Sequence, residues 1–383
     1  MRIVVLKELH AGEDRVAATP DSVKRFCAKG ATVAVEAGAG LSSGIDDGAY
    51  EAAGASVFGS PEGALEGADV VLKVRCPMTA EQGVDEVAQL PAGSLVVGFL
   101  NPHSNPDNIQ ALAKQRVTSF AVEFLPRISR AQSMDALSSQ SNLAGYKAVV
   151  DAAAMLPKAL PMMMTAAGTV APAKVLVLGA GVAGLQAIAT AKRLGAVVSA
   201  FDVRPAVREQ VESLGGRFIE VDASGEEAET EGGYAREMGE DYRRLQQELI
   251  HDAAAVSDVV ITTALIPGRP APVLLPEATI DNMLPGSVVI DLAVEAGGNC
   301  PLSRTGETIN RNGVQIVGPR NLPGTLSHDT SALYARNLYA FMEPLIAEGG
   351  ELDVPWDDPI VAASVVTRDG AVVHESLEDR TNG

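Results

Sequence analysis

The sequence predicts two α/β domains, each built on a doubly wound parallel sheet, with a cleft between them. Short apolar runs rich in valine and isoleucine alternate with stretches of helical pattern, and this alternation occurs twice along the chain. Strands that alternate with helices at this spacing indicate parallel sheets with helices on both faces. A chain of 383 residues is also longer than one hydrophobic core usually serves, which makes two domains the expected number.

The first domain begins with five apolar runs that predict strands, at residues 2–8, 32–38, 69–74, 94–100 and 118–124. Helical stretches lie between them. The stretch 20–30 starts at Pro20 and stops at Gly30, and the stretch 105–115 is entered through an Asn-Pro pair. Proline at a helix start and glycine at its end are the residues that those positions favour.

The second domain repeats the pattern, with predicted strands at residues 174–179, 197–203, 217–221, 258–264, 287–293 and 314–318. Beyond it, residues 331–348 have the spacing of an amphipathic helix, which we expect to pack back on the first domain. Asp369-Gly370 lies between β-branched runs and predicts a hairpin, whose exposed edges make it a candidate dimer or partner contact. The predicted domains are residues 1–137 with 327–383, and residues 138–326.

Composition narrows the function classes. Apolar residues make up 46% and charged residues 21%, as in a soluble globular enzyme, and the net charge of −19 argues against nucleic acid or anionic lipid as a partner. Cys27, Cys76 and Cys300 lack metal-ligand spacing, so we expect free thiols in a reducing cytoplasm and no metal. The N-terminus lacks the apolar stretch of an export signal. The uncharged stretch 175–191 contains a glycine turn, so no membrane span is predicted.

A dinucleotide signature opens the second domain. Gly179, Gly181 and Gly184 have G-x-G-x-x-G spacing, they follow an apolar strand and open a helical pattern, and the next strand ends at Asp202. The first glycine permits a tight turn, the second lets a pyrophosphate approach the backbone, and the third lets the helix pack on the sheet. The N–H groups at the helix start can bind phosphate. We therefore predict a Rossmann-like dinucleotide-binding domain.

Asp202 also indicates which dinucleotide binds. A carboxylate at this strand end accepts hydrogen bonds from both ribose hydroxyls and repels a 2′-phosphate, which favours NAD(H). Arg204, two residues on, could instead hold that phosphate, so NADP(H) is the alternative.

Two polar segments have an open interpretation. Residues 127–146 contain two arginines, glutamines, an aspartate and several serines, and are either a solvated connector or the wall of a site. Positions 132, 135 and 138 are three apart, so one helical turn or compact loop could present them together. Residues 222–247 are acidic but contain Tyr234 and Met238, and are either a surface loop or a lid over a bound ligand.

No histidine supplies an obvious acid–base group. An NAD-dependent dehydrogenase of a small alcohol or amine needs a proton donor or acceptor beside the hydride acceptor. No histidine of the chain lies in a motif connected to the site; the five are His10, His103, His251, His328 and His374. His10 and His103, on loops after first-domain strands, are the only candidates for a cleft.

Six segments together closely resemble a known family: "GEDRVAATP", "PRISRAQSMDALSSQSNLAGY", "PMMMTAAGTV", "GVAGLQAIATAKRLGA", "ITTALIPGRPAPVL" and "VIDLAVEAGGNCPLS". The family is domain I of proton-translocating NAD(P) transhydrogenase, the NAD(H)-binding N-terminal region of its alpha subunit. The resemblance covers essentially the whole chain, and the family is similar in fold to alanine dehydrogenase.

The resemblance implies a role for the polar stretch. Arg127 and Asp135 would form an ion pair that frames the dihydronicotinamide, Gln132 would reach toward the nicotinamide and the incoming second cofactor, and Ser138 would bind the carboxamide. These four are the implied catalytic residues. The implied cofactor-binding residues are Arg127, Ile128, Ser129, Gln132, Ser138, Gly179, Gly181, Val182, Ala183, Gly184, Asp202, Val203, Arg204, Gly233, Tyr234, Gln246, Ala264 and Leu265. Hydride passing between two nicotinamides leaves no alkoxide or amine to protonate, which explains the missing acid–base pair.

The resemblance also implies partners. Hydride would pass between NADH on this chain and NADP+ on a partner subunit, coupled to proton translocation by membrane-embedded subunits. The chain would be a homodimer in the cytoplasm, attached to the inner face of the cell membrane through those subunits.

Two alternatives stay open. The first is an alanine-dehydrogenase-like oxidoreductase, a relative that holds pyruvate with an arginine, a lysine and a histidine. Arg15 is kept here, but Arg75 and Asn101 stand where the lysine and the histidine would be. The second is a non-catalytic NAD-binding regulatory module, which gives the polar stretch no purpose.

Overall fold

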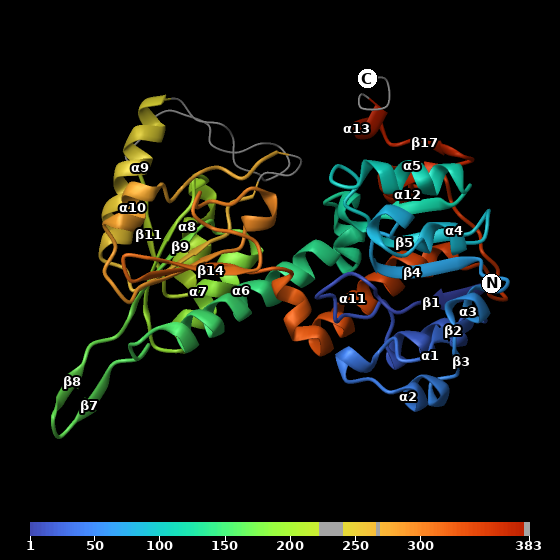
Figure 1. Ribbon diagram of the computed structural model, residues 1–383, viewed down its shortest axis with the longest axis horizontal. Coiled ribbons are helices and arrows are strands. Elements are labelled where there is room, and N and C mark those ends of the chain that lie inside the picture. Colours follow the sequence, from blue (N-terminus) through green and yellow to red (C-terminus); the bar gives the residue numbers. More distant parts are fainter. Residues whose placement is uncertain (222–239, 266–268, 379–383) are drawn as a thin grey trace. The chain divides into compact units, whose positions relative to one another are not determined.

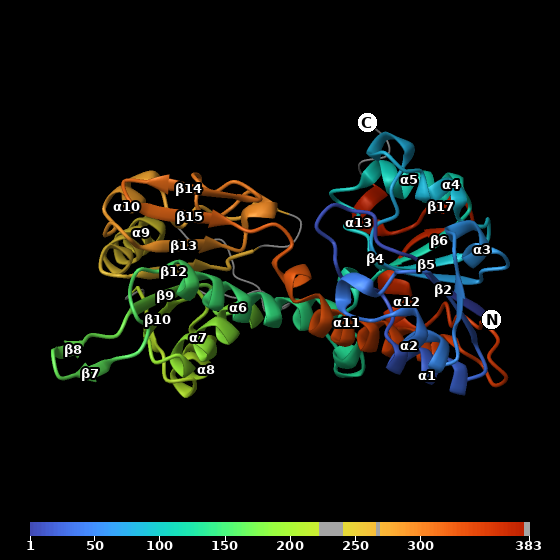
Figure 2. The same cartoon turned by 60° about the horizontal axis from the view of Figure 1, so that its bottom comes forward.

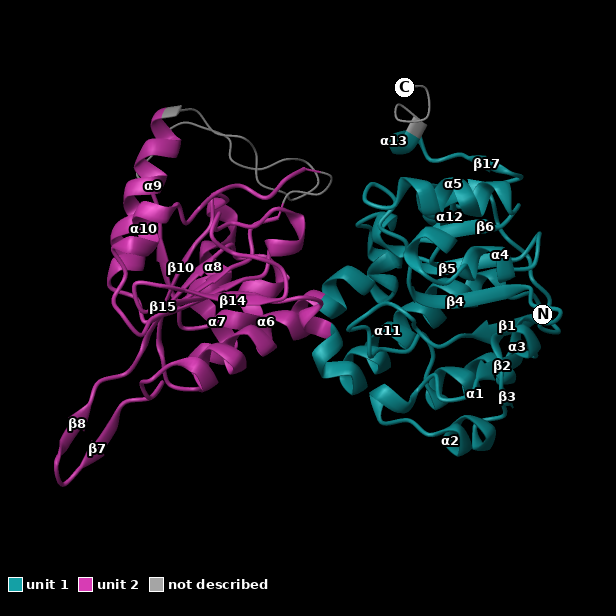
Figure 3. Cartoon of the chain, in the orientation of Figure 1, with its two compact units in different colours: residues 1–140, 324–383 teal, residues 141–323 magenta. Residues whose placement is uncertain are grey.

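The computed structural model describes residues 1–221, 240–265 and 269–378. The chain forms two compact units, residues 1–140 with 324–383 and residues 141–323 (Figure 3). The first boundary lies inside helix α6 (Ala136–Met155). The cleft predicted between the two domains stays a prediction.

Unit 1 is built on an eight-stranded sheet in the described residues, in the order β17-β16-β6-β5-β4-β1-β2-β3 (Figure 1). Its strands are β1 (Arg2–Val5), β2 (Thr32–Glu36), β3 (Ser56–Phe58), β4 (Val70–Arg75), β5 (Leu95–Phe99), β6 (Thr118–Ala121), β16 (Val365–Arg368) and β17 (Ala371–Val372). The first six are parallel, as predicted, although the short β3 was not predicted. The tail hairpin is confirmed, but β16 pairs with β6, so β17 rather than the whole hairpin is at the sheet edge.

Helices cover both faces of this sheet, because successive strand residues such as Ile3 and Val4 are both buried. One face carries α1 (Pro20–Ala28), α2 (Asp47–Ala52), α11 (Ser327–Met342) and α12 (Pro359–Ser364). The other carries α3 (Pro61–Leu65), α4 (Glu86–Gln89), α5 (Pro106–Lys114) and the short α13 (Glu375–Glu378). Helix α11 buries Tyr334 and Phe341 in the core, which confirms that the predicted amphipathic helix returns to this domain.

Unit 2 has a seven-stranded sheet in its described residues, in the order β11-β10-β9-β12-β13-β15-β14. Its strands are β9 (Lys174–Leu178), β10 (Val197–Phe201), β11 (Arg217–Ile219), β12 (Val259–Thr262), β13 (Val288–Asp291), β14 (Glu307–Arg311) and β15 (Val314–Gly318). All pairs are parallel except β14 with β15, and β14 was not predicted. Figure 2 shows α7 (Val182–Arg193) and α8 (Arg208–Ser213) on one face and α9 (Glu240–Ala255) and α10 (Glu277–Asp281) on the other.

Both sheets reverse their strand order at one place, between β1 and β4 in unit 1 and between β9 and β12 in unit 2. Ligands of open α/β sheets bind outside the carboxyl ends of the strands at such a switch point. Each unit therefore has one edge where a site is expected.

A two-stranded hairpin in unit 2 was not predicted. It consists of β7 (Met163–Thr165) and β8 (Gly168–Val170), and it extends away from the seven-stranded sheet in both views (Figures 1 and 2). Its side chains are exposed, Met164 by 81%. The sequence analysis treated this segment only as a piece of a family motif.

No helix among the described residues is long and apolar enough to cross a membrane.

Candidate functional site

The glycine turn after β9 has the geometry that the signature requires. Gly179 has a φ of +102°, which L side chains rarely adopt. A Cβ on Gly184 would lie 1.8 Å from the carbonyl oxygen of Gly179, so only glycine lets α7 pack this close to the turn. A Cβ on Gly181 would meet no atom within 4 Å. The protein itself therefore requires the first and third glycines, whereas a ligand that approaches the backbone would require the second.

Asp202, the predicted ribose acceptor, is buried beyond the end of β10 and already has four donors. Its Oδ2 accepts from the Ala180 N–H at 2.7 Å, and its Oδ1 accepts from the Arg204 N–H at 2.9 Å. The Arg204 guanidinium donates from Nε to Oδ1 and from Nη2 to Oδ2, both at 3.0 Å. A carboxylate has about four acceptor positions, so ribose hydroxyls would have to take the place of the guanidinium. Arg204 was predicted as an alternative phosphate ligand, and here it binds Asp202.

The end of β12 lies beside the glycine turn and is held by buried polar side chains. The Thr263 hydroxyl donates to the Gly179 carbonyl at 3.0 Å. The Asn299 side chain accepts from the Ala264 N–H at 3.1 Å and donates to the Ala264 carbonyl at 2.9 Å. Asp291 in turn accepts from the Asn299 N–H at 3.2 Å. This network positions Ala264, a predicted cofactor residue.

Sequence reasoning missed Asn299 and Asp291. Both side chains are fully buried, and Asp291 also accepts from the Thr262 hydroxyl at 2.9 Å and the Ser303 hydroxyl at 2.6 Å. The signal in the sequence was an aspartate at the end of a predicted central strand, where it would need hydrogen-bond donors.

The other predicted nucleotide residues of unit 2 are partly or largely accessible. Val182, the first residue of α7, is 40% exposed and Leu265 is 49% exposed. Ala183, Val203 and Gln246 are half-buried. The remaining predicted residues, Gly233 and Tyr234, lie outside the described residues, as does Met238 of the predicted lid.

The polar segment predicted as a wall begins in unit 1. Ser129–Met134 form the 3-10 helix η4, and α6 starts at Ala136. Asp135 stands between the two, and its carboxylate accepts from the Ser138 N–H at 2.9 Å and from the Ser138 hydroxyl at 2.6 Å. Asp135 thus caps α6, a role that aspartate commonly has before a helix. The ion pair between Asp135 and Arg127 stays a prediction.

Side chains of this segment face two ways. Ala131 and Met134 are buried in the unit 1 core, which fixes the backbone of η4. The polar positions that were predicted to meet the cofactor are exposed, together with one apolar neighbour: Arg127, Ile128, Ser129 and Gln132. The segment therefore presents an exposed row of predicted site residues on a backbone anchored from below.

Unit 1 has the same kind of switch point as unit 2, but charged side chains fill it. Lys73 of β4 is fully buried and lies 2.7 Å from a Glu86 oxygen and 3.3 Å from a Glu8 oxygen. Burial alone would lower the pKa of Lys73, but the two carboxylates outweigh it and the pKa is raised. The Val74 N–H donates to Glu8 at 2.7 Å, which helps to compensate the second carboxylate.

The candidates of the dehydrogenase alternative lie at the same edge. Arg15 is buried and donates to both oxygens of Glu13 at 2.7 Å and to the Gln140 side chain at 2.8 Å. Arg75 Nε is 3.6 Å from a Glu13 oxygen. Asn101, two residues beyond β5, is exposed.

The two loop histidines have local partners. His10 Nε2 is 2.8 Å from the Cys76 carbonyl oxygen, and the His103 ring contacts Phe124 at 5.6 Å between centroids. No group of residues in the described ranges could hold a metal ion, and the three cysteines are free thiols.

Comparison with known proteins agrees with this construction. The alanine dehydrogenase/PNT N-terminal domain family matches residues 4–144, and the corresponding C-terminal domain family matches residues 148–375. The chain is 54% identical to a first-segment NAD(P) transhydrogenase alpha subunit of Rhodospirillum rubrum, over 98% of this chain and 99% of that protein.

Solved structures show the same likeness. A transhydrogenase from Sinorhizobium meliloti superposes with a TM-score of 0.88 at 48% identity, over 97% of this chain and 100% of that one. An L-alanine dehydrogenase superposes with a TM-score of 0.83 at 26% identity, over 99% and 98%. The chain therefore belongs to the alanine dehydrogenase/PNT family and, within it, to the NAD(P) transhydrogenase alpha subunits.

Proposed function

We propose that this chain binds NAD(H) and passes hydride directly between NADH and an NADP+ held on a partner subunit of a proton-translocating transhydrogenase. The observation that carries the proposal is Asn101, an exposed amide beyond β5 where the dehydrogenase relative would have its proton-transfer histidine. An amide cannot take up or release a proton near neutral pH. A reaction that needs no proton transfer suits such a site.

Hydride transfer between two nicotinamides meets this condition. One hydride leaves C4 of NADH and joins C4 of NADP+, which yields NAD+ and NADPH with no proton exchanged at the reacting carbons. The protein then has to hold the two rings with the reacting atoms roughly 3–3.5 Å apart and to exclude water. Positioning residues matter more than acid–base residues in such a site.

NAD(H) would occupy unit 2 with its pyrophosphate over the Gly179–Gly184 turn and its adenosine ribose on Asp202. Leu265 and Gln246 would line the same site. The polar segment would supply Gln132 and Arg127 beside the nicotinamide. Residues 222–247, with Gly233 and Tyr234, would close over the nucleotide.

Asp135 and Ser138 would act as a preset pair at the nicotinamide. Their mutual hydrogen bond at 2.6 Å orients the hydroxyl before any ligand arrives. Ser138 could accept from a carboxamide N–H while it keeps this bond, because a hydroxyl donates once and accepts through two lone pairs. Arg127 would pair with Asp135 to complete the frame.

Partner subunits belong to the proposal. An NADP-binding subunit would present the second nicotinamide, and membrane-embedded subunits would couple the reaction to proton translocation. The chain would then be cytoplasmic and attached to the inner face of the cell membrane through them. A homodimer is also proposed, for which the edge strand β17 is a candidate contact.

Mixing the purified chain with an NADP-binding partner domain tests the function. Stopped-flow absorbance or fluorescence should show hydride moving from NADH to NADP+ only when both proteins are present. Oxidation of alanine with NAD+ by the chain alone would favour the alanine-dehydrogenase alternative. Tight NADH binding with neither reaction would favour the regulatory module.

A further inference from the structure

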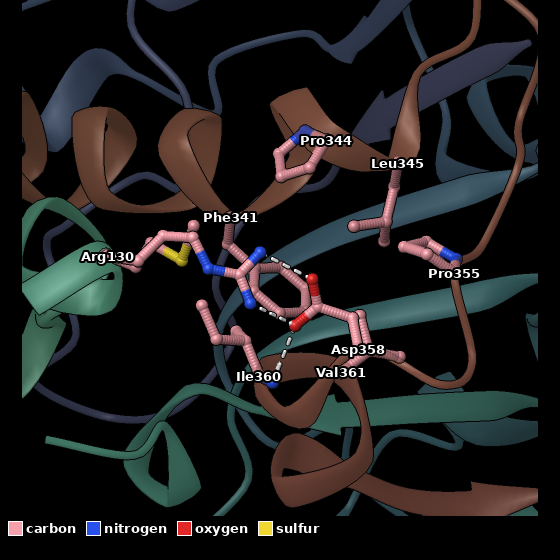
Figure 4. Close-up of a pocket in the computed structure, with 9 residues that line it drawn as sticks. Arg130, Phe341, Pro344, Leu345, Pro355, Asp358, Ile360 and Val361 are labelled. Carbon is pink, nitrogen blue, oxygen red and sulfur yellow. Dashed lines mark hydrogen bonds and ion pairs between the residues drawn. The ribbon is translucent and has the colours of Figure 1, made fainter. Parts of the chain in front are cut away.

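Arg130 and Asp358 form a bidentate ion pair within unit 1. Arg130 Nη1 lies 2.6 Å from Asp358 Oδ2, and Nη2 lies 2.7 Å from Oδ1. Figure 4 shows the guanidinium and the carboxylate facing each other beside the apolar side chains of a small pocket. Two parallel hydrogen bonds fix the direction of approach as well as the distance.

The Asp358 end of this pair is anchored. Asp358 is the N-cap of α12, and its Oδ1 also accepts from the Ile360 N–H at 2.8 Å. Helix α12 buries Ile360 and Val361 in the unit 1 core. Only 17% of the Asp358 side chain is exposed, whereas 54% of the Arg130 side chain is. Asp358 is therefore a fixed point to which Arg130 is tied.

The Arg130 end lies in the segment proposed to meet the nicotinamide. Arg130 is in η4, three residues after Arg127 and two before Gln132. The C-terminal half of η4 is held by Asn337, whose side-chain amide donates to the Ser133 carbonyl at 2.9 Å. The ion pair holds the N-terminal half, which follows Arg127 directly.

Packing leaves room for this half to move. A hollow of about 230 Å³ lies beside the ion pair, lined by Met134, Phe341, Leu345 and Ile360 among others. Side chains do not fill the space between η4 and the segment that leads into α12. The distance between the two thus depends on the ion pair in addition to the core contacts of Ala131 and Met134.

We propose that Arg130 and Asp358 are positioning residues that set the place of Arg127 and Gln132, and so the rate of hydride transfer. The inference rests on the proposed function. The pair is too exposed to contribute much to stability. A displacement of about 1 Å at a reacting pair can nevertheless slow a reaction on the order of a hundredfold. Loss of the pair should therefore slow transfer without weakening the fold or NADH binding.

Two conservative variants isolate the pair. Asp358→Asn keeps the shape and the helix cap, because asparagine is as good an N-cap as aspartate, but it removes the charge. Arg130→Lys keeps the charge but loses the bidentate fork. A matched control exists in unit 2, where Arg311 and Asp281 form an exposed bidentate pair at 2.7 and 2.8 Å. Arg311→Lys and Asp281→Asn change the same chemistry away from the polar segment.

Stopped-flow transfer in the complex with the NADP-binding partner gives the first readout. We expect each Arg130 or Asp358 variant to slow transfer about tenfold or more, with the NADH dissociation constant within about twofold of wild type. The double variant should be no slower than the slower single variant, because both remove one interaction. The control variants should transfer at the wild-type rate. Wild-type transfer in Arg130→Lys and Asp358→Asn, or equal slowing in the controls, would overturn the inference.

Hydrogen exchange gives a second readout that does not depend on hydride transfer. The N–H groups of η4 should exchange faster in Asp358→Asn than in wild type, while those of α6 beyond Gln140 do not change. Unchanged exchange in η4 would overturn the inference even if transfer slowed. If the wild-type complex transfers no hydride at all, the proposed function fails, and exchange alone then decides whether the pair positions η4.

Discussion

Arg204 places Nε and Nη2 of its guanidinium on the two carboxylate oxygens of Asp202, each at 3.0 Å. The residue expected to bind ribose is thus already bound by a neighbour two positions along the chain. Only 7% of the Asp202 side chain and 17% of the Arg204 side chain are exposed, so solvent screens the pair weakly. Binding of NAD(H) would replace this contact by hydrogen bonds from the two hydroxyls.

Cofactor preference should depend on this pair. The wild-type chain should bind NADH better than NADPH, because Asp202 repels a 2′-phosphate. Asp202→Ala should weaken NADH binding by about 1–3 kcal/mol, the effect of leaving hydrogen-bonding groups without a partner. It also releases Arg204, which can then meet the phosphate of NADPH, so the preference should narrow from both sides. Fluorescence titration measures both affinities, and equal wild-type affinity for the two nucleotides would refute this account of selectivity.

The glycine turn offers a matched pair of variants. Gly181→Ala adds a Cβ that meets no protein atom within 4 Å, so stability should change by less than about 1 kcal/mol while NADH binding weakens tenfold or more. Gly184→Ala adds a Cβ 1.8 Å from a backbone oxygen and should destabilise unit 2 itself. Thermal unfolding and NADH titration separate the two effects. Normal NADH affinity in Gly181→Ala would show that no pyrophosphate lies against this glycine.

Gln132 should act on the rate of transfer rather than on affinity. Gln132→Asn keeps the amide but shortens the side chain by one methylene, which should misplace the rings by about 1 Å and slow transfer on the order of a hundredfold. An interaction made mainly in the transition state changes the rate and leaves ground-state binding alone. NADH affinity should therefore stay within a few fold of wild type. Asp135→Asn should have a milder effect, since asparagine still caps α6. Stopped-flow transfer at the wild-type rate in Gln132→Asn would exclude this segment as the wall of the site.

Stability should depend on pH through Glu123, which follows β6. Burial raises the pKa of Glu123 to about 7. Its Oε2 is enclosed and has no hydrogen-bond partner in the described residues, while its Oε1 accepts from the Asn101 N–H. Because the folded pKa lies above the unfolded value, the protonated form stabilises the fold at low pH, and this contribution is lost as the pH rises through about 7.

Glu123→Gln removes this titration and keeps the shape of the side chain. The variant should match wild type near pH 5 and exceed it above pH 7, by on the order of 1–3 kcal/mol in free energy of unfolding. Urea unfolding between pH 5 and pH 8 measures the difference. A constant difference across this range would mean that the carboxyl group titrates normally in the folded protein.

Local features of the sequence were enough for the fold class, the family and the glycine turn. The alternation of strands and helices depends on stretches of roughly ten residues, and the nucleotide signature on about 30 consecutive residues, so both can be recognised without a structure. Both units have the predicted parallel sheets, and the Gly179 and Gly184 geometry agrees with the roles expected of them. Short elements such as β3, β14 and the β7–β8 hairpin were missed, because a strand of three to five residues carries little periodic signal.

Only the tertiary structure decided which partner each polar side chain has. Arg130 meets Asp358 from 228 positions away, and Asn299 reaches Ala264 across 35. The tail strand β16 lies on β6 rather than at a free edge. Even Arg204 and Asp202, two residues apart, meet because the chain turns beyond β10 and points both side chains to one place. Such contacts depend on how separate chain segments are brought together in space, and residue spacing in the sequence does not contain that information.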